Sequence, residues 1–166
     1  MKVYKLELYI DGNEDFYSEF AIEASNSFED FHKIIIKTLD LKNSEMASFF
    51  ICDNKWNKEK EITLFDMKLD EDKSNDDNYI LTMKNTMIKD VVDDKHRLMH
   101  YVYDFLNMQT FNIELISIDD IKEKKKYPIC ICCDNFEGNK IEEVENIFDS
   151  EDDILLDSDE LPEDYY

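Results

Sequence analysis

The sequence predicts an α+β domain, in which a mixed or antiparallel sheet built from hairpins carries one main helix on one face, in a β-grasp-like or α/β-roll order. The first observation is an alternation of apolar and polar residues over 4–10 and again over 16–22. The second is a change to a period near 3.6 over 28–39. The third is the charge distribution, which divides the 166 residues into an α+β globular domain over 1–133 and an acidic C-terminal tail over 134–166.

The first strands and the helix follow from these periods. Apolar side chains recur at every second position in YKLELYI and, after the turn DGNED, again in FYSEFAIEA, so the two segments predict a hairpin. Ser27 then stands three residues before Asp30, a variant of the capping box that opens many helices. The spacing predicts a helix over 28–39 that lies on the sheet.

Later segments continue the sheet. The expected elements are strands at 48–53, 61–67, 97–106 and 110–118, an extended segment at 79–83, a short helix after Thr86, and a last strand in YPICICC at 127–133. Tyr101, Tyr103 and Phe105 fall at every second position, as base-stacking aromatic residues do in RNA-recognition strands. Because glycine and basic neighbours are missing, we expect this ladder to face the core, opposite Phe111, Ile113 and Leu115.

Charge limits the classes of partner. The net charge is −22, of which segment 134–166 contributes −13 and residues 1–133 contribute −9. Affinity for nucleic-acid phosphate and for anionic lipid depends on Lys and Arg, so direct binding to either is disfavoured. The one basic cluster, Lys122 with Lys124–Lys126, is too small to reverse this. An acidic field attracts basic proteins and divalent cations instead.

Localisation is predicted from what the sequence does not contain. No stretch approaches the ~20 apolar residues needed to span a bilayer. The N-terminal MKVYKLELYIDG carries charges throughout and lacks the apolar run of a secretory signal. We therefore expect a cytoplasmic protein without membrane contact, in which the 4 cysteines are free thiols.

Two sets of residues include side chains of the types that bind metals. His96 and His100 have the spacing of the zinc motif HExxH, but Arg97 replaces its glutamate, and on a strand four positions span roughly 13 Å. The loop with Asp66, Asp70, Glu71, Asp72, Asp76 and Asp77 lacks the order of an EF-hand and is expected to be solvated. We expect no bound metal and no cofactor.

The cysteines are the other candidates for chemistry. Cys130, Cys132 and Cys133 form C-x-C-C, in which a regular strand would direct Cys130 and Cys132 to one face and Cys133 to the other. A thiol made reactive by Lys124–Lys126 stays open, although free cysteines lining a small core are the preferred interpretation. Since no catalytic grouping of Ser, His, Cys and Asp stands out, we expect the protein not to be an enzyme.

Several phrases together resemble a known family. SFFICDNKWNKEKEITLFDM, YVYDF with a second apolar strand behind it, and YPIC are similar to the plasmid pRiA4b ORF-3-like family, also described as the passenger protein of IS1096-type mobile elements, in its acidic-tailed bacterial branch. The marker residues are Tyr103, Asp104, Phe105, Tyr127, Pro128 and Cys130. The resemblance covers most of residues 1–133 and implies a small α+β domain without an established enzymatic activity.

This sequence departs from the family pattern at two places. Family members often continue Y-D-F with Gly-Asp, a Trp and a His, where this chain has Leu106-Asn107, Gln109 and Phe111. After YPIC many members have a Gly-rich segment that ends in Pro-Pro-Glu-Asp, and this chain has CCDNFEGNK and a distant LPED at 161–164. The resemblance therefore implies the fold more than a function.

The acidic tail supplies the functional hypotheses. A disordered tail that only maintains solubility is the default interpretation. Its small apolar groups alternate with acidic blocks, however, and this pattern favours the alternative of a segment that folds on a basic, grooved partner. The candidate partner-binding residues are Ile147, Phe148, Ile154, Leu155, Leu156 and Leu161. The preferred hypothesis is a non-catalytic interaction module, associated with mobile elements, whose acidic tail and surface engage a basic protein. The alternatives are a DNA mimic that regulates a nucleic-acid-binding protein and a metal-dependent hydrolase that uses the Asp-rich loop or the Cys and His residues.

Overall fold

The computed structural model describes residues 1–42, 46–65, 80–122, 125–134, 140–141 and 144–145. The chain opens with the predicted hairpin, formed by strands β1 (Lys2–Ile10) and β2 (Asn13–Glu23). The two strands are antiparallel, with Leu6 opposite Phe20. Gly12 in the connecting turn has a φ of 76°, a left-handed conformation that glycine adopts without steric penalty.

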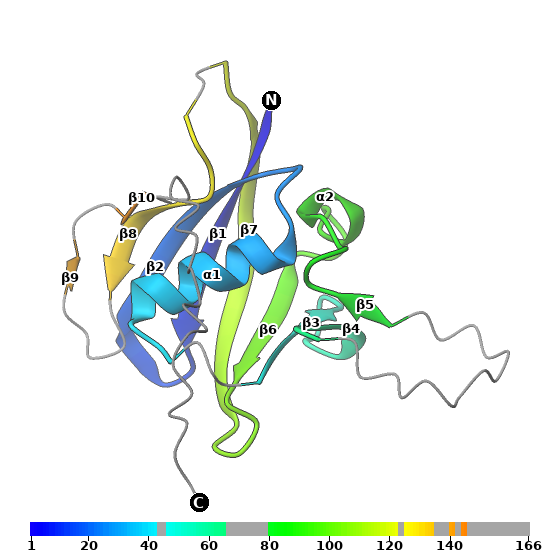
Figure 1. Ribbon diagram of the computed structural model, residues 1–166, viewed down its shortest axis with the longest axis vertical. Helices are drawn as coiled ribbons and strands as arrows, with labels where there is room; N and C mark the ends of the chain where they lie inside the picture. The colour runs from blue at the N-terminus through cyan, green and yellow to red at the C-terminus, as the bar shows by residue number, and fades with distance from the viewer. Residues whose placement is uncertain (43–45, 66–79, 123–124, 135–139, 142–143, 146–166) are drawn as a thin grey trace, which may run out of the picture.

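Helix α1 (Phe28–Leu39) has the predicted bounds and the predicted cap. The Asp30 amide donates to Ser27 Oγ at 3.1 Å, and the Ser27 amide donates to the Asp30 carboxylate at 2.9 Å. The capping box therefore satisfies amides that a helix start otherwise leaves without partners. The helix crosses the sheet diagonally on one face (Figure 1).

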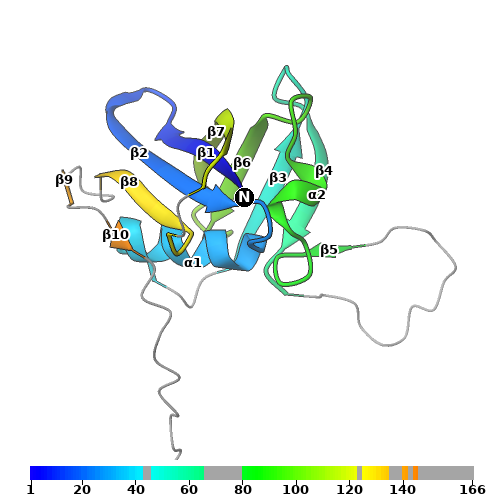
Figure 2. The same cartoon turned by 90° about the horizontal axis from the view of Figure 1, so that it is seen from above.

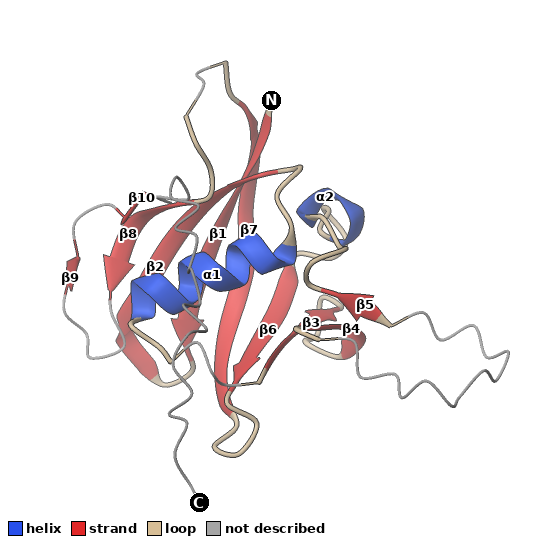
Figure 3. Ribbon diagram, viewed as in Figure 1, coloured by secondary structure: helices blue, strands red, loops and turns tan. Residues whose placement is uncertain are grey.

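The rest of the chain extends the sheet on both sides of this hairpin. Its described elements are β3 (Ala47–Cys52), β4 (Lys58–Thr63), β5 (Leu81–Thr82), the short helix α2 (Ile88–Val91), β6 (Leu98–Tyr103), β7 (Gln109–Asp120), β8 (Ile129–Asp134), β9 (Lys140–Ile141) and β10 (Val144–Glu145). The strand expected at 61–67 is thus wrong in its bounds, because β4 begins at Lys58 and ends at Thr63. The prediction of an α+β fold with one main helix is confirmed (Figure 3).

The described strands join one open sheet in the order β10–β8–β2–β1–β7–β6–β3–β4–β5, and β9 also pairs with β8. All of these pairs are antiparallel except β4–β5, which is parallel and makes the sheet mixed. Strand β1 lies inside the sheet, between β2 and β7. Seen from above, the sheet curves and α1 lies on its inner side (Figure 2).

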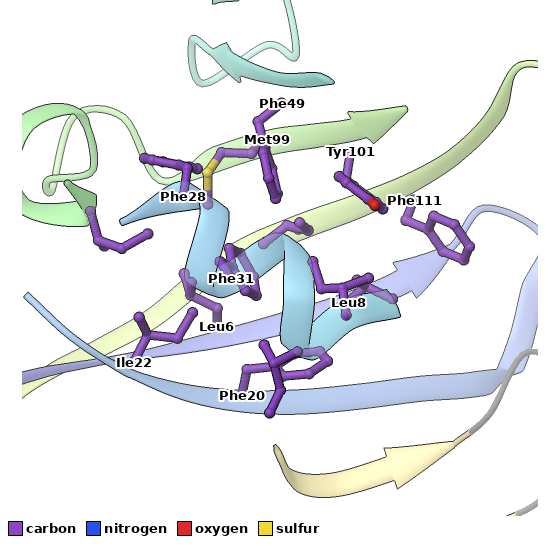
Figure 4. Close-up of a cluster of buried hydrophobic side chains, with 14 of the residues drawn as sticks. Leu6, Leu8, Phe20, Ile22, Phe28, Phe31, Phe49, Met99, Tyr101 and Phe111 are labelled. Atoms are coloured by element: carbon purple, nitrogen blue, oxygen red, sulfur yellow. The ribbon is translucent and has the colours of Figure 1, made fainter. Parts of the chain in front are cut away.

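The core fills the space between α1 and the sheet. Phe31 packs against Phe20 of β2 and Phe49 of β3, with ring centroids 5.6 and 5.4 Å apart. Phe49 in turn contacts Tyr101 of β6 at 4.8 Å. These aromatic contacts join strands from both halves of the sheet to one helix (Figure 4).

The aromatic ladder of β6 faces this core in part. Tyr101 is fully buried opposite Phe111, and Tyr103 is buried as well, as predicted. The expectation for Phe105 is wrong: β6 ends at Tyr103, and Phe105 lies in the turn to β7, where it is 37% exposed. The inward-facing row of β6 therefore consists of Met99, Tyr101 and Tyr103.

The cysteines of β8 differ most from expectation. Cys130 and Cys133 form a disulfide and are not free thiols, whereas Cys52 and Cys132 are free. Phe20 pairs with Cys130 and the adjacent Glu19 with Cys132, so one step along β2 faces two steps along β8. This β-bulge adds one residue and interrupts the alternation of side chains. Cys130 and Cys133 therefore both point inward, while Cys132 is exposed, and the prediction that Cys130 and Cys132 share a face is wrong.

Candidate functional site

The candidate site is the sheet face turned away from α1, which we call the outer face. Both helices pack against the inner face. The buried side chains of α1 belong to one core cluster together with Ile88 of α2 and Val92, which directly follows α2. Within the described ranges no helix lies over the outer face of β2, β1 and β7 (Figure 2). Side chains at every second position of these strands are therefore available for contact.

Three glutamates lie side by side on the outer face. Glu7 of β1 is directly opposite Glu19 of β2 on one side and Glu114 of β7 on the other. We call Glu19, Glu7 and Glu114 the glutamate row. All three side chains are partly exposed. Neighbouring strands are about 4.8 Å apart, so the row places like charges at short range, an arrangement that destabilises a sheet.

Tyrosines form the next row along the same strands. Tyr9 of β1 is opposite Tyr17 of β2. The Tyr17 hydroxyl lies 3.2 Å from a carboxylate oxygen of Glu7 and 3.2 Å from one of Glu19. Burial, and then the charges of Glu19 and Glu7, raise the pKa of Tyr17, so the phenol stays neutral and donates. Burial, and then Glu114, Asp11 and Glu7, also raise the pKa of Tyr9.

The glutamate row has no cationic partner in the part of the chain that the structure describes. The neighbouring outer-face cation, Lys5, pairs instead with Asp119 at 3.4 Å. A single hydroxyl hydrogen on Tyr17 cannot neutralise two carboxylates. Among the described residues the row therefore places negative charge beside two aromatic rings, and both features attract ammonium and guanidinium groups in general, by charge and by cation–π contact.

The outer face continues toward β3 with different chemistry. His100 of β6 lies opposite Asn112 of β7, and the His100 Nδ1 is 2.9 Å from the Asn112 Oδ1. Trp56, at a φ of 65° in the β3–β4 turn, places its ring 4.9 Å from the His100 ring. Lys58 Nζ lies 4.1 Å from the centre of the Phe50 ring. In this part of the outer face a cation, Lys58, already contacts an aromatic ring. The glutamate row, by contrast, has no described cation as a partner.

His96 and His100, which have the spacing of the zinc motif HExxH, contact different partners. His96 contacts Asp93 at 2.9 Å and Glu59 at 3.3 Å, whereas His100 contacts Asn112 and Trp56. His100 lies on strand β6, as expected from the sequence. Across the described residues no three His, Cys, Asp or Glu side chains gather as a metal site would require. The Asp-rich loop at 66–77 lies outside the described residues.

The family-marker residues occupy structural positions. The buried Tyr103 hydroxyl donates to the Lys42 carbonyl at 2.8 Å. Asp104 follows at a φ of 55°, and its carboxylate accepts from the Leu106 amide and from the Asn107 side chain, so these residues shape the β6–β7 turn. The exposed Phe105 belongs to the same turn.

The second group of markers closes one end of the outer face. Tyr127 packs on the outer face in a small cluster with Val3, Ala21 and Ile129. A cis peptide joins it to Pro128, and its carbonyl accepts from the Asn26 side chain at 3.4 Å. Cys130 takes part in the disulfide.

The six candidate partner-binding residues of the tail cannot be placed. Ile147, Phe148, Ile154, Leu155, Leu156 and Leu161 lie outside the described residues. The structure does describe two short strands after β8: Ile141 of β9 pairs with Cys133, and Val144 of β10 pairs with Cys130. In the described part of the chain, no helix has the length and apolar character needed to cross a membrane.

The glutamate row was not predicted from the sequence. Glu7 could be assigned to the polar side of a strand, because it alternates with Leu6 and Leu8. Its contact with Glu114 depends on pairing between β1 and β7, which are more than 100 residues apart in the chain. Only knowledge of that strand pairing would have revealed the row.

Comparisons with known proteins support the fold. A family model described as plasmid pRiA4b ORF-3-like protein matches residues 2–156. The crystal structure of a protein of unknown function, MM3350 from Methanosarcina mazei Go1, is similar with a TM-score of 0.64 and 22% identity, over 80% of this chain and 68% of that chain. At that identity the likeness is one of fold. The comparison with curated proteins finds no match.

Proposed function

The chain belongs to the plasmid pRiA4b ORF-3-like family, and on that premise we propose that it is a non-catalytic interaction module that engages a basic protein. The observation that carries the proposal is the glutamate row on the outer face. The proposed partner presents Arg or Lys side chains to this row and to the adjacent Tyr9 and Tyr17. The acidic tail adds a second contact.

Electrostatics favours a cationic occupant of the outer face. Each cross-strand pair of like charges destabilises a sheet by roughly 0.2–1 kcal/mol, and no described cation relieves the pairs formed by Glu7. A guanidinium placed between two carboxylates attracts both of them and donates paired hydrogen bonds to a carboxylate in bidentate geometry. The negative field also accelerates encounter with a basic partner.

The tyrosines favour arginine or lysine over an inorganic cation. Tyr9 and Tyr17 form cross-strand neighbours one row beyond the glutamates. Aromatic faces attract organic cations and bury the aliphatic stems of Lys and Arg. A partner segment crossing both rows therefore gains charge pairing and apolar contact together.

The tail contributes through its alternating apolar and acidic groups. Residues Ile147, Phe148, Ile154, Leu155, Leu156 and Leu161 are proposed to dock on the same basic partner. Because β10 ends at Glu145 within the sheet, a truncation that tests the tail should begin at residue 146. Removal from residue 141 would also take away strand pairs with β8.

The experiment uses fluorescence anisotropy with a labelled nine-residue arginine peptide as the probe. The test variant replaces the row by amides, E7Q/E19Q/E114Q. The matched control, D40N/D94N/D120N, removes the same formal charge at exposed positions outside the glutamate row. We expect the row variant to weaken binding about tenfold relative to the control at 0.1 M salt, because close charge pairs contribute more than the net charge.

The outcomes separate the two contacts. Equal affinities for the row variant and the matched control would refute the outer face as the docking surface. A chain ending at Glu145 that binds the peptide as the full chain does would refute the contribution of the tail. Thermal unfolding of each variant checks that it is folded.

A DNA mimic is the second candidate, and the same ordered row of carboxylates favours it. A mimic occupies the groove of a nucleic-acid-binding protein and so competes with DNA for that protein. Once a basic partner is identified, a competition assay with a labelled duplex distinguishes the two. Displacement of the duplex supports mimicry, whereas a ternary complex contradicts it.

A further inference from the structure

We infer that Cys130, Cys132 and Cys133 form a thiol–disulfide exchange site, in which exposed Cys132 connects the buried Cys130–Cys133 pair with low-molecular-weight thiols and disulfides of the glutathione class. This goes beyond the proposed function and does not depend on it. The inference rests on three features of β8: the disulfide, the bulge and the free thiol between the paired cysteines.

The bulge explains how the disulfide forms within one strand. Residues three apart on a regular strand point to opposite faces and lie roughly 10 Å apart. Here the extra residue places Cys130 and Cys133 on the same face, with their Cα atoms 6.0 Å apart. That separation lies within the usual range for a disulfide.

Burial closes the direct route to this disulfide. Cys130 is 0% exposed and Cys133 is 2% exposed, both within the main core cluster. An exchange reaction requires a thiolate to reach a sulfur atom, so an external thiol has little access to either one. Cys132 is exposed and free, and it is adjacent in sequence to Cys133.

The bulge also supplies a route between the two faces. When the extra residue moves from before Cys132 to after it, the regular alternation returns over 130–132 and turns Cys132 toward Cys130. This movement involves only the bulged stretch of β8, whose end is held separately by hydrogen bonds between Asp134 and Ser18 at 3.1 Å. Local opening of this kind needs less free energy than global unfolding.

Reduction of the Cys130–Cys133 disulfide proceeds through three successive attacks by a thiolate on a sulfur atom. The Cys132 thiolate attacks Cys130 Sγ, so a Cys130–Cys132 bond forms, the Cys130–Cys133 bond breaks, and the Cys133 thiolate leaves and takes a proton from water. A glutathione thiolate then attacks Cys132 Sγ and releases the Cys130 thiolate, which is protonated in turn. A second glutathione thiolate attacks the glutathione sulfur, forms glutathione disulfide and frees Cys132. One protein disulfide is reduced while two glutathione thiols are oxidised.

The test follows reduction of the oxidised full-length protein by glutathione, without oxygen, with acid quench, alkylation and mass analysis of tryptic peptides. Cleavage after lysine places the three cysteines in peptide 127–140 and Cys52 in peptide 43–55, so the buried Cys52 serves as an internal control. We expect C132S to slow reduction about tenfold or more, because it removes the accessible thiol. The matched control I131S changes the neighbouring exposed position and should react as the wild type does.

A second variant traps the intermediate. In C130S/C133S no cysteine remains to resolve a mixed disulfide, so glutathione disulfide should leave one stable glutathione on peptide 127–140 and none on peptide 43–55. Reduction of C132S within twofold of the wild-type rate would overturn the inference. So would the absence of the Cys130–Cys133 disulfide from wild-type protein equilibrated with glutathione disulfide, or a double variant that modifies Cys132 no faster than Cys52.

Discussion

At the scale of single residues, His32 is a buried titratable group whose pKa affects stability. It lies on α1, is 2% exposed, and its Nδ1 is 2.9 Å from the Tyr101 hydroxyl. Its Nε2 is buried without a hydrogen-bond partner among the described residues. Burial is the largest cause that lowers the pKa of His32; Glu29 opposes the shift, Lys33 adds to it, and the net result is a pKa of about 4. The imidazole is therefore neutral in the folded protein at neutral pH.

This shift predicts how stability depends on pH. Because the folded-state pKa lies below the ordinary value of 6.5, the unfolded chain binds more protons than the folded chain between those values. The free energy of unfolding should fall as pH decreases through this window, with a loss from His32 of about 2 kcal/mol between pH 7 and pH 5. Urea unfolding at the two pH values measures it, and H32L should lose about 2 kcal/mol less than the wild type.

The control for His32 is Y101F, which removes the hydrogen-bonding hydroxyl and keeps the buried imidazole. Its free energy of unfolding should be lower by about 1 kcal/mol at both pH values. The wild-type pH dependence should remain. An H32L chain with the full wild-type loss at pH 5 would contradict the assignment of that loss to His32.

Tyr17 allows a second test at this scale. Its hydroxyl is the described donor to both Glu7 and Glu19, so Y17F should reduce the free energy of unfolding by about 1 kcal/mol. Part of that deficit is unrelieved repulsion between carboxylates and should shrink at 1 M NaCl. Y9F is the matched control, because no described hydrogen bond involves the Tyr9 hydroxyl. An equal effect of Y9F, or a deficit that salt does not change, would argue against the row as a repulsive cluster.

At the scale of elements, β8 depends on its disulfide. A bridge that closes so short a loop stabilises by about 2 kcal/mol in the chain-entropy description, so reduction should lower the free energy of unfolding by that amount. Urea unfolding with and without a phosphine reductant measures the loss. The variant C130A/C133A should be insensitive to the reductant, and C52S should respond as the wild type does. A wild-type protein that ignores the reductant would contradict the contribution of the bridge.

Elements whose signals are local could be predicted from the sequence. The bounds of α1 follow from Ser27, Asp30 and the 3.6-residue period, and the β1–β2 hairpin from its alternation and turn. The register could not, because the pairing of Glu7 with Glu114 joins segments far apart in the chain. The bulge at Cys132 could not be predicted from the sequence either, because the apolar run of this strand contains no local signal for an extra residue. The sequence assigns Phe105 to the core because it continues the apolar alternation of the strand, but the strand ends at Tyr103 and Phe105 lies in the turn that follows.

At the scale of the whole molecule, the two faces of the sheet differ: the inner face holds the core, and the outer face carries the charged glutamate row. The inner face of the sheet carries the aromatic core on α1, which fixes the fold and uses the family-marker Tyr103. The outer face carries the glutamate row, whose like charges oppose the pairing of its own strands. Because the net charge is −22, a basic peptide is attracted to the whole molecule, and only the position of the bound peptide distinguishes the outer face from other acidic surfaces.

The most direct measurement is a nitrogen–proton NMR titration of the full chain with the arginine peptide. If the outer face and the tail bind the peptide, the largest amide shifts should fall on β1, β2 and β7, at Glu7, Tyr9, Tyr17, Glu19 and Glu114, with a second set in residues 146–166. Amides of α1, beneath the opposite face, should move little. Shifts spread in proportion to local acidity, or confined to segments away from the glutamate row, would contradict binding at the outer face.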